Sequence, residues 1–154
     1  MADGETGREG LFSTDRGRLR QAYHEAWRKR RQGEPLEPLE GLIAAVVEDH
    51  PEYHAMLAGA DALEREFPAQ LGAVNPYLHM GLHLAVREQV AIDRPLGVRS
   101  RYQGLGARLR GPHEAEHAMM DCLAAGLWES QRYRRPPDEA AYLECLERLV
   151  RGVS

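Results

Sequence analysis

The chain lacks the features that mark several broad protein classes. Its 154 residues include only two cysteines and 6% aromatic residues. No apolar run approaches the roughly 18 residues of a membrane-spanning helix. Basic residues are not in excess either, since 20 Lys and Arg stand against 24 Asp and Glu, for a formal net charge of −4. We therefore expect no disulfide framework, no membrane segment and no general nucleic-acid partner, because nucleic-acid-binding surfaces are usually basic.

The N-terminal stretch and the two cysteines bear on the cellular location. The first ten residues, MADGETGREG, are polar and lack the apolar centre of a secretory signal. Cys122 and Cys145 both fall in stretches with a helical pattern, and we expect reduced thiols. A cytoplasmic protein is the simplest interpretation. The sequence also contains no glycine-rich phosphate loop, nucleophile elbow or CxxC motif.

Apolar residues recur every three to four positions, which predicts helices, and no alternating strand pattern stands out. We expect residues 1–12 to be a disordered lead and residues 13–152 to form one domain, an all-α bundle of about five to six helices. Prolines mark the clearest helix starts. The expected helices span about 13–31, 38–49, 51–67, 75–93, 112–132 and 138–151, with a weaker, glycine-interrupted helix or loop at 98–109.

Six of the seven histidines fall into three H-x-x-x-H pairs. Residues four apart in a helix lie on one face. Each pair also lies close to a proline that could start a helix, and the helix dipole there favours the neutral imidazole that binds metals. A single buried histidine is more often a hydrogen-bonded core residue, but six buried imidazoles without a ligand would leave many ring nitrogens to satisfy. The pattern therefore predicts a histidine-rich metal site between helices.

Carboxylates near these pairs complete the predicted ligand set. Glu116 shares a helix face with the pair in HEAEH, and Asp121 extends that face. Glu88 lies roughly opposite the nearest histidine pair on an ideal helix, and the proline break before Glu52 makes its direction uncertain. The candidate ligands are His50, His54, His79, His83, His113, His117, Glu116, Glu52, Glu88 and Asp121.

The types of ligand indicate which metal to expect. Six imidazoles with carboxylates exceed one tetrahedral zinc site and suit two metal ions that share carboxylate bridges, as in di-iron helix bundles. Two iron ions are therefore the predicted cofactor, while zinc, manganese and copper remain alternatives. HEAEH also matches the metalloprotease string H-x-x-E-H, but a peptidase site would leave the other four histidines unexplained.

Three strings carry a resemblance to a known family. HPEYH, NPYLHMGLHLAVREQ with DRPLGVR behind it, and HEAEHAMMDCL followed by LWESQR resemble a small bacterial family catalogued as domain of unknown function 1841. The resemblance runs from about Trp27 to Tyr142 and implies no activity. In architecture the chain also resembles hemerythrin-like bundles, which hold two irons with histidines and carboxylates. The three pairs here do not reproduce the hemerythrin spacings, so oxygen carriage is not implied.

The expected function is metal binding by a helical bundle with a dinuclear centre. If the protein is an enzyme, we expect a non-haem oxidoreductase that uses dioxygen or peroxide, with dioxygen or a small molecule as its partner; the catalytic residues are not identified. The alternatives are a non-catalytic metal-binding, storage or sensing protein and a zinc protein with a structural or hydrolytic role. The sequence also allows a homodimer.

Overall fold

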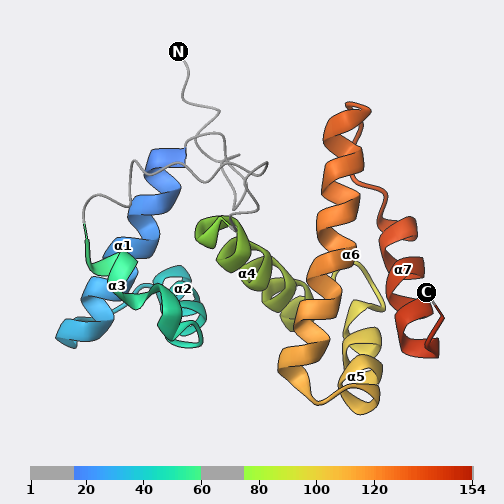
Figure 1. The fold of residues 1–154 in the computed structure, drawn as a ribbon, viewed down its shortest axis with the longest axis horizontal. Helices are drawn as coiled ribbons and strands as arrows, with labels where there is room; N and C mark the ends of the chain where they lie inside the picture. The colour runs from blue at the N-terminus through green and yellow to red at the C-terminus, as the bar shows by residue number, and fades with distance from the viewer. Residues whose placement is uncertain (1–15, 60–74, 154) are drawn as a thin grey trace. The chain divides into compact units, whose positions relative to one another are not determined.

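The structure is a computed structural model that describes residues 16–59 and 75–153 (Figure 1). Within these ranges all regular structure is helical, which confirms the predicted all-α class. The described ranges contain seven α-helices, where about five to six were expected. The additional helix is the glycine-interrupted stretch near residue 100, which was expected to be a weaker helix or a loop. They are α1 (Arg16–Gln32), α2 (Pro38–Glu48), α3 (His54–Ala58), α4 (Pro76–Ile92), α5 (Val98–Arg108), α6 (Pro112–Arg132) and α7 (Glu139–Arg151), with a short 3-10 helix η2 (Pro51–Tyr53) before α3.

The chain divides into two compact units, residues 1–84 and 85–154, and the boundary falls inside α4. The expected single domain over 13–152 stays a prediction, and the expected lead at 1–12 lies outside the described residues. No helix within the described ranges combines the length and apolarity needed to cross a membrane.

In the first unit, α1 packs against α2 and α3. A capping box between Glu37 and Glu40, followed by a proline in the first turn, starts α2. The predicted break after α2 is present, but the following helix ends at Ala58, well before the predicted end near residue 67; residues 60–67 lie outside the described part. The apolar core of this unit consists of Tyr23, Ala26, Trp27, Ile43, Val46, Val47, Leu57, Tyr77, Met80 and Leu84.

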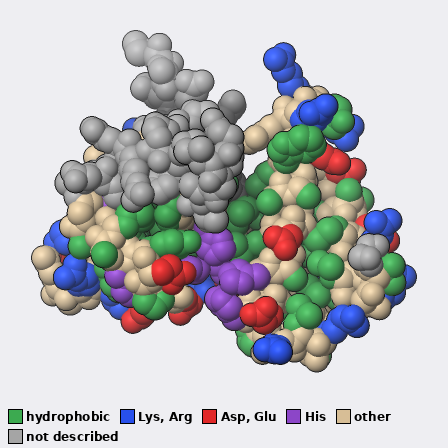
Figure 2. All heavy atoms as spheres, in the orientation of Figure 1, with side chains coloured by type: hydrophobic (Ala, Val, Ile, Leu, Met, Phe, Trp, Pro, Cys, Tyr) green, Lys and Arg blue, Asp and Glu red, His purple; other side chains and the backbone are tan. Residues whose placement is uncertain are grey.

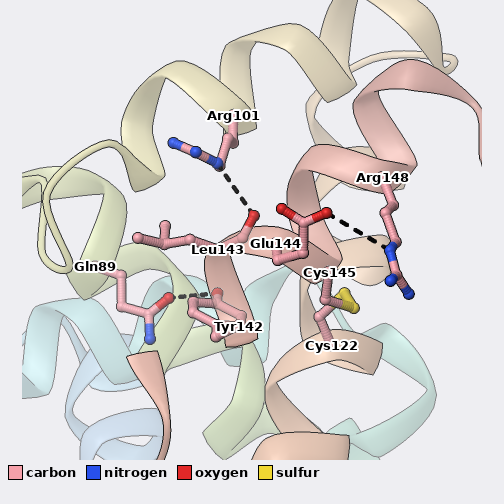
Figure 3. The surroundings of a disulfide bond; sticks show 8 residues. All are labelled: Gln89, Arg101, Cys122, Tyr142, Leu143, Glu144, Cys145 and Arg148. Atoms are coloured by element: carbon pink, nitrogen blue, oxygen red, sulfur yellow. Dashed lines mark hydrogen bonds and ion pairs between the residues drawn. A yellow bond between two sulfur atoms is a disulfide. The ribbon is translucent and has the colours of Figure 1, made fainter. Parts of the chain in front are cut away.

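In the second unit, α5, α6 and α7 pack pairwise against one another. A disulfide joins Cys122 of α6 to Cys145 of α7 (Figure 3). The prediction of reduced thiols was therefore wrong. The turn between α6 and α7 brings the two Cα atoms to 6.0 Å, within the span of a disulfide, although the cysteines are 23 residues apart in the sequence. The cytoplasmic location stays a prediction.

Candidate metal centre

Three of the predicted ligands, His50, His79 and His83, come together in the first unit. Each offers a ring nitrogen, and these nitrogens lie within 4.8 Å of one another. The ring centroids of His50 and His83 are 4.5 Å apart, and those of His79 and His83 are 4.8 Å apart. The imidazole of His50 also meets that of His79 edge to face, at 5.2 Å. The three rings therefore form a compact cluster, which we call the three-histidine cluster.

The start of α4 sets the positions of two members of the cluster. The Asn75 side chain accepts hydrogen bonds from the backbone N–H groups of Tyr77 and Leu78, at 3.0 and 3.3 Å. This cap and Pro76 in the first turn confirm the predicted helix start. Because the helix is regular from there on, His79 and His83 lie one turn apart on the same face.

The distance between these two imidazoles is the most informative one in the cluster. Nε2 of His79 and Nε2 of His83 are 3.2 Å apart. Two nitrogens bound to one metal ion at about 2.0–2.1 Å, with an angle of roughly 90° to 109° between the bonds, would be separated by roughly 2.9–3.4 Å. A hydrogen bond between two neutral imidazoles gives a similar distance. The pair is therefore spaced as two ligands of one ion would be, without requiring one.

His50 is only 2% exposed, and its contacts orient the ring. Its Nδ1 lies 2.7 Å from the Val46 carbonyl oxygen, to which it donates. The Tyr53 ring stacks almost parallel to the imidazole, at 5.5 Å between centroids. A neutral histidine that donates from Nδ1 carries its lone pair on Nε2, the form in which histidine binds a metal.

His54 lies outside the three-histidine cluster, although it shares the HPEYH string with His50. Its Nε2 lies 2.9 Å from the Val47 carbonyl oxygen, and its ring packs on Trp27 at 4.3 Å. The two histidines do not share a helix face, because His50 has a non-helical backbone, with φ −127° and ψ 68°, and precedes η2.

The seventh histidine, His24 of α1, was not among the predicted site residues. Its Nε2 lies 2.8 Å from the Tyr77 hydroxyl, and the guanidinium of Arg20 lies over the Tyr77 ring at 4.6 Å. Burial lowers the pKa of His24 below its ordinary value, and a backbone hydrogen bond at Leu57 acts in the opposite direction. The sequence offers no signal for this contact, since His24 has no histidine or carboxylate four residues away.

The second unit carries the third histidine pair. The rings of His113 and His117 on α6 are 4.3 Å apart. Glu116 between them is buried, and its two carboxylate oxygens accept from Nε of Arg87 at 3.0 and 3.2 Å. An arginine therefore engages the carboxylate that was predicted to be a ligand or bridge. Metal binding by His113, His117 and Glu116 stays a prediction.

The remaining predicted carboxylates lie in more open positions. Glu52 and Asp121 are exposed, and Glu88 is half-buried. Among the residues that the structure describes, no carboxylate or thiol joins the three-histidine cluster. Within residues 16–59 and 75–153, the donors that meet there are therefore imidazoles.

The fold and the cluster define a helical protein whose histidines are compatible with a metal site. Residues 15–148 match the family described as Domain of unknown function (DUF1841), and the chain belongs to this family. The resemblance predicted from the sequence motifs is thereby confirmed. A search of curated proteins and a search of solved structures each found no match. The likeness to hemerythrin stays a prediction.

Proposed function

We propose that this protein binds a transition-metal ion through His50, His79 and His83. The observation that carries the proposal is the 3.2 Å separation of the two Nε2 atoms on α4, beside a third imidazole whose Nδ1 is engaged by a carbonyl. Imidazole ligands suit zinc, iron, cobalt, nickel and copper. Because the cluster contains no carboxylate or thiol among the described residues, hard ions such as magnesium and calcium are disfavoured.

One metal ion is favoured over two at this cluster. Three nitrogens within 4.8 Å of one another suffice for one ion, and a bridged pair of ions would need carboxylates close by. Glu116, the best bridge candidate from the sequence, is paired with Arg87. A dinuclear iron centre that also uses His113, His117 and Glu116 is the alternative, and in it Arg87 would compete with the metal for the Glu116 carboxylate.

The described part of the first unit supplies three imidazoles, and the total number of protein ligands separates two classes of site. Structural zinc sites usually have four protein ligands, whereas catalytic sites usually have three. A metal held by three imidazoles would supply a Lewis acid, and with iron also a redox centre. A site with three protein ligands would suit a catalytic or sensing role, and a site completed by a fourth protein ligand would suit a structural one; the oxygen- or peroxide-dependent oxidase is the version that needs iron.

The deciding experiment is elemental analysis of protein purified without an affinity tag, before and after reconstitution. The variants are His83→Ala and His54→Ala, which remove a member of the cluster and a matched histidine outside it. We expect about one ion per chain in the wild type, at least a tenfold loss of occupancy in His83→Ala, and unchanged occupancy in His54→Ala. Circular dichroism confirms that each variant keeps its helices.

Other results would contradict the proposal in different ways. Absence of metal after reconstitution, or equal metal content in the wild type and His83→Ala, would rule out the three-histidine cluster as the site. Two irons per chain, lost in His117→Ala and accompanied by absorption bands that respond to reduction, would favour the dinuclear alternative instead.

A further inference from the structure

The disulfide in the second unit borders a cavity of about 160 Å³ between α6 and α7. Figure 3 shows the disulfide linking the two helices. Its two halves differ in accessibility, since Cys122 is buried, with 4% exposure, whereas Cys145 is half-buried. The difference in residue exposure favours attack by an external thiol at Cys145 over attack at Cys122.

Small residues keep this cavity open. Ala125 and Gly126 of α6 line it together with Ala141 of α7. A Cβ atom added at Gly126 would meet no other atom within 4 Å, so packing does not require glycine there. At about 30 Å³ per water molecule, the cavity has room for about five waters, which is the scale of one amino acid.

Charged residues line the same cavity. Arg135, Glu129 and Asp138 are among the lining residues, and the Arg135 guanidinium lies over the Tyr133 ring at 5.2 Å. Asp138 is held in place at the start of α7, where its carboxylate accepts from the Ala141 N–H at 3.0 Å. The C-terminal end of α6, at the top of that helix in Figure 2, also carries several blue (Lys or Arg) side chains. A cation and two anions around a small cavity suit a ligand that carries both a carboxylate and an ammonium group.

We propose that this cavity binds a small zwitterionic thiol of the cysteine type, which exchanges with the disulfide at Cys145. The thiolate of the ligand attacks Sγ of Cys145, forming a new S–S bond. The bond between Cys122 and Cys145 breaks, and its electron pair leaves on Sγ of Cys122, which takes a proton from water. The ligand sulfur is oxidised as the Cys122 sulfur is reduced, so no further oxidant is needed. Attack by the Cys122 thiolate reverses the step and releases the ligand.

The test compares two thiols on the full chain. The protein is incubated with cysteine and cystine, or with 2-mercaptoethanol and its disulfide, at equal thiolate and disulfide concentrations. After acid quenching, mass spectrometry of peptides locates each mixed disulfide. We expect the adduct on Cys145, with Cys122 as a thiol, and formation at least tenfold faster with cysteine. Adducts mainly on Cys122, equal rates for the two thiols, or no adduct would overturn the proposal.

Variants separate a binding cavity from a merely accessible disulfide. Gly126→Leu should fill the cavity and slow adduct formation at least tenfold. Gly106→Leu on α5 is the matched control, because a Cβ there also meets no atom within 4 Å, and its rate should equal that of the wild type.

Arg135→Gln keeps the proposal testable if the leucine variant fails to fold. It should reduce the preference for cysteine at least fivefold and leave the rate with 2-mercaptoethanol unchanged. Wild-type preference in Arg135→Gln would overturn the assignment of the carboxylate to Arg135 and, with it, the zwitterionic ligand.

Discussion

Arg87 and Glu116 form an ion pair in which the carboxylate side chain is only 9% exposed. Removing the cation from a pair with a buried partner leaves a charge that water solvates poorly. We expect Arg87→Met to lower the free energy of unfolding by about 3 kcal/mol. Urea denaturation followed by circular dichroism measures this change.

The exposed pair between Arg148 and Glu144 provides the control. Both of its side chains are more than half exposed, and the N–O distance is 3.7 Å. Exposed pairs contribute about 0–1 kcal/mol, so Arg148→Met should change stability by less than about 1 kcal/mol. Equal effects of the two substitutions would show that Glu116 does not depend on Arg87.

His24 should make stability depend on pH. Burial lowers its pKa in the folded state below the ordinary value of 6.5, so the unfolded chain binds more protons at this position. Stability from this residue is therefore complete above pH 6.5 and decreases as the pH falls below it. We expect His24→Asn to lose less stability than the wild type between pH 7 and pH 5, measured as the urea midpoint. A larger loss in the variant would contradict the assigned direction.

The disulfide between α6 and α7 should contribute to the stability of the folded chain. A disulfide that closes a loop with a sequence separation of 23 residues restricts the unfolded chain. By the chain-entropy relation this contributes about 3 kcal/mol. We expect dithiothreitol to lower the free energy of unfolding by about this amount and to have no effect on the double variant Cys122→Ala with Cys145→Ala. If the reductant acted equally on both proteins, its target would not be this disulfide.

The helix starts could be predicted from the sequence because their causes are local. At the start of α4, the Asn75 side chain caps the helix and Pro76 fixes the backbone angle of the first turn. At the start of α6, Pro112 fixes that angle in the same way. The disulfide could not be predicted in this way. It depends on the turn that brings α6 and α7 together, and two cysteines 23 residues apart carry no sign of that turn.

In the candidate site, too, the sequence predicted the local contacts but not those that depend on distant parts of the chain. His79 and His83 meet as predicted, because the helical period holds along α4. The same rule fails for His50 and His54, since the chain leaves the helix at His50 and passes through η2. The sequence indicated the proline break there, but the direction of His54 after it depends on its contact with Trp27, which lies on α1.

For the whole molecule, metal binding should appear as added stability. An ion that binds only the folded chain raises the free energy of unfolding by about 2.7 kcal/mol when its free concentration is a hundredfold above Kd. We therefore expect Zn²⁺ or Fe²⁺ to raise the unfolding midpoint, and a chelator to reverse the effect. The shift should persist in His54→Ala and vanish in His83→Ala, because only the second loses a nitrogen of the three-histidine cluster. A full shift in His83→Ala would place the responsible ion elsewhere in the chain.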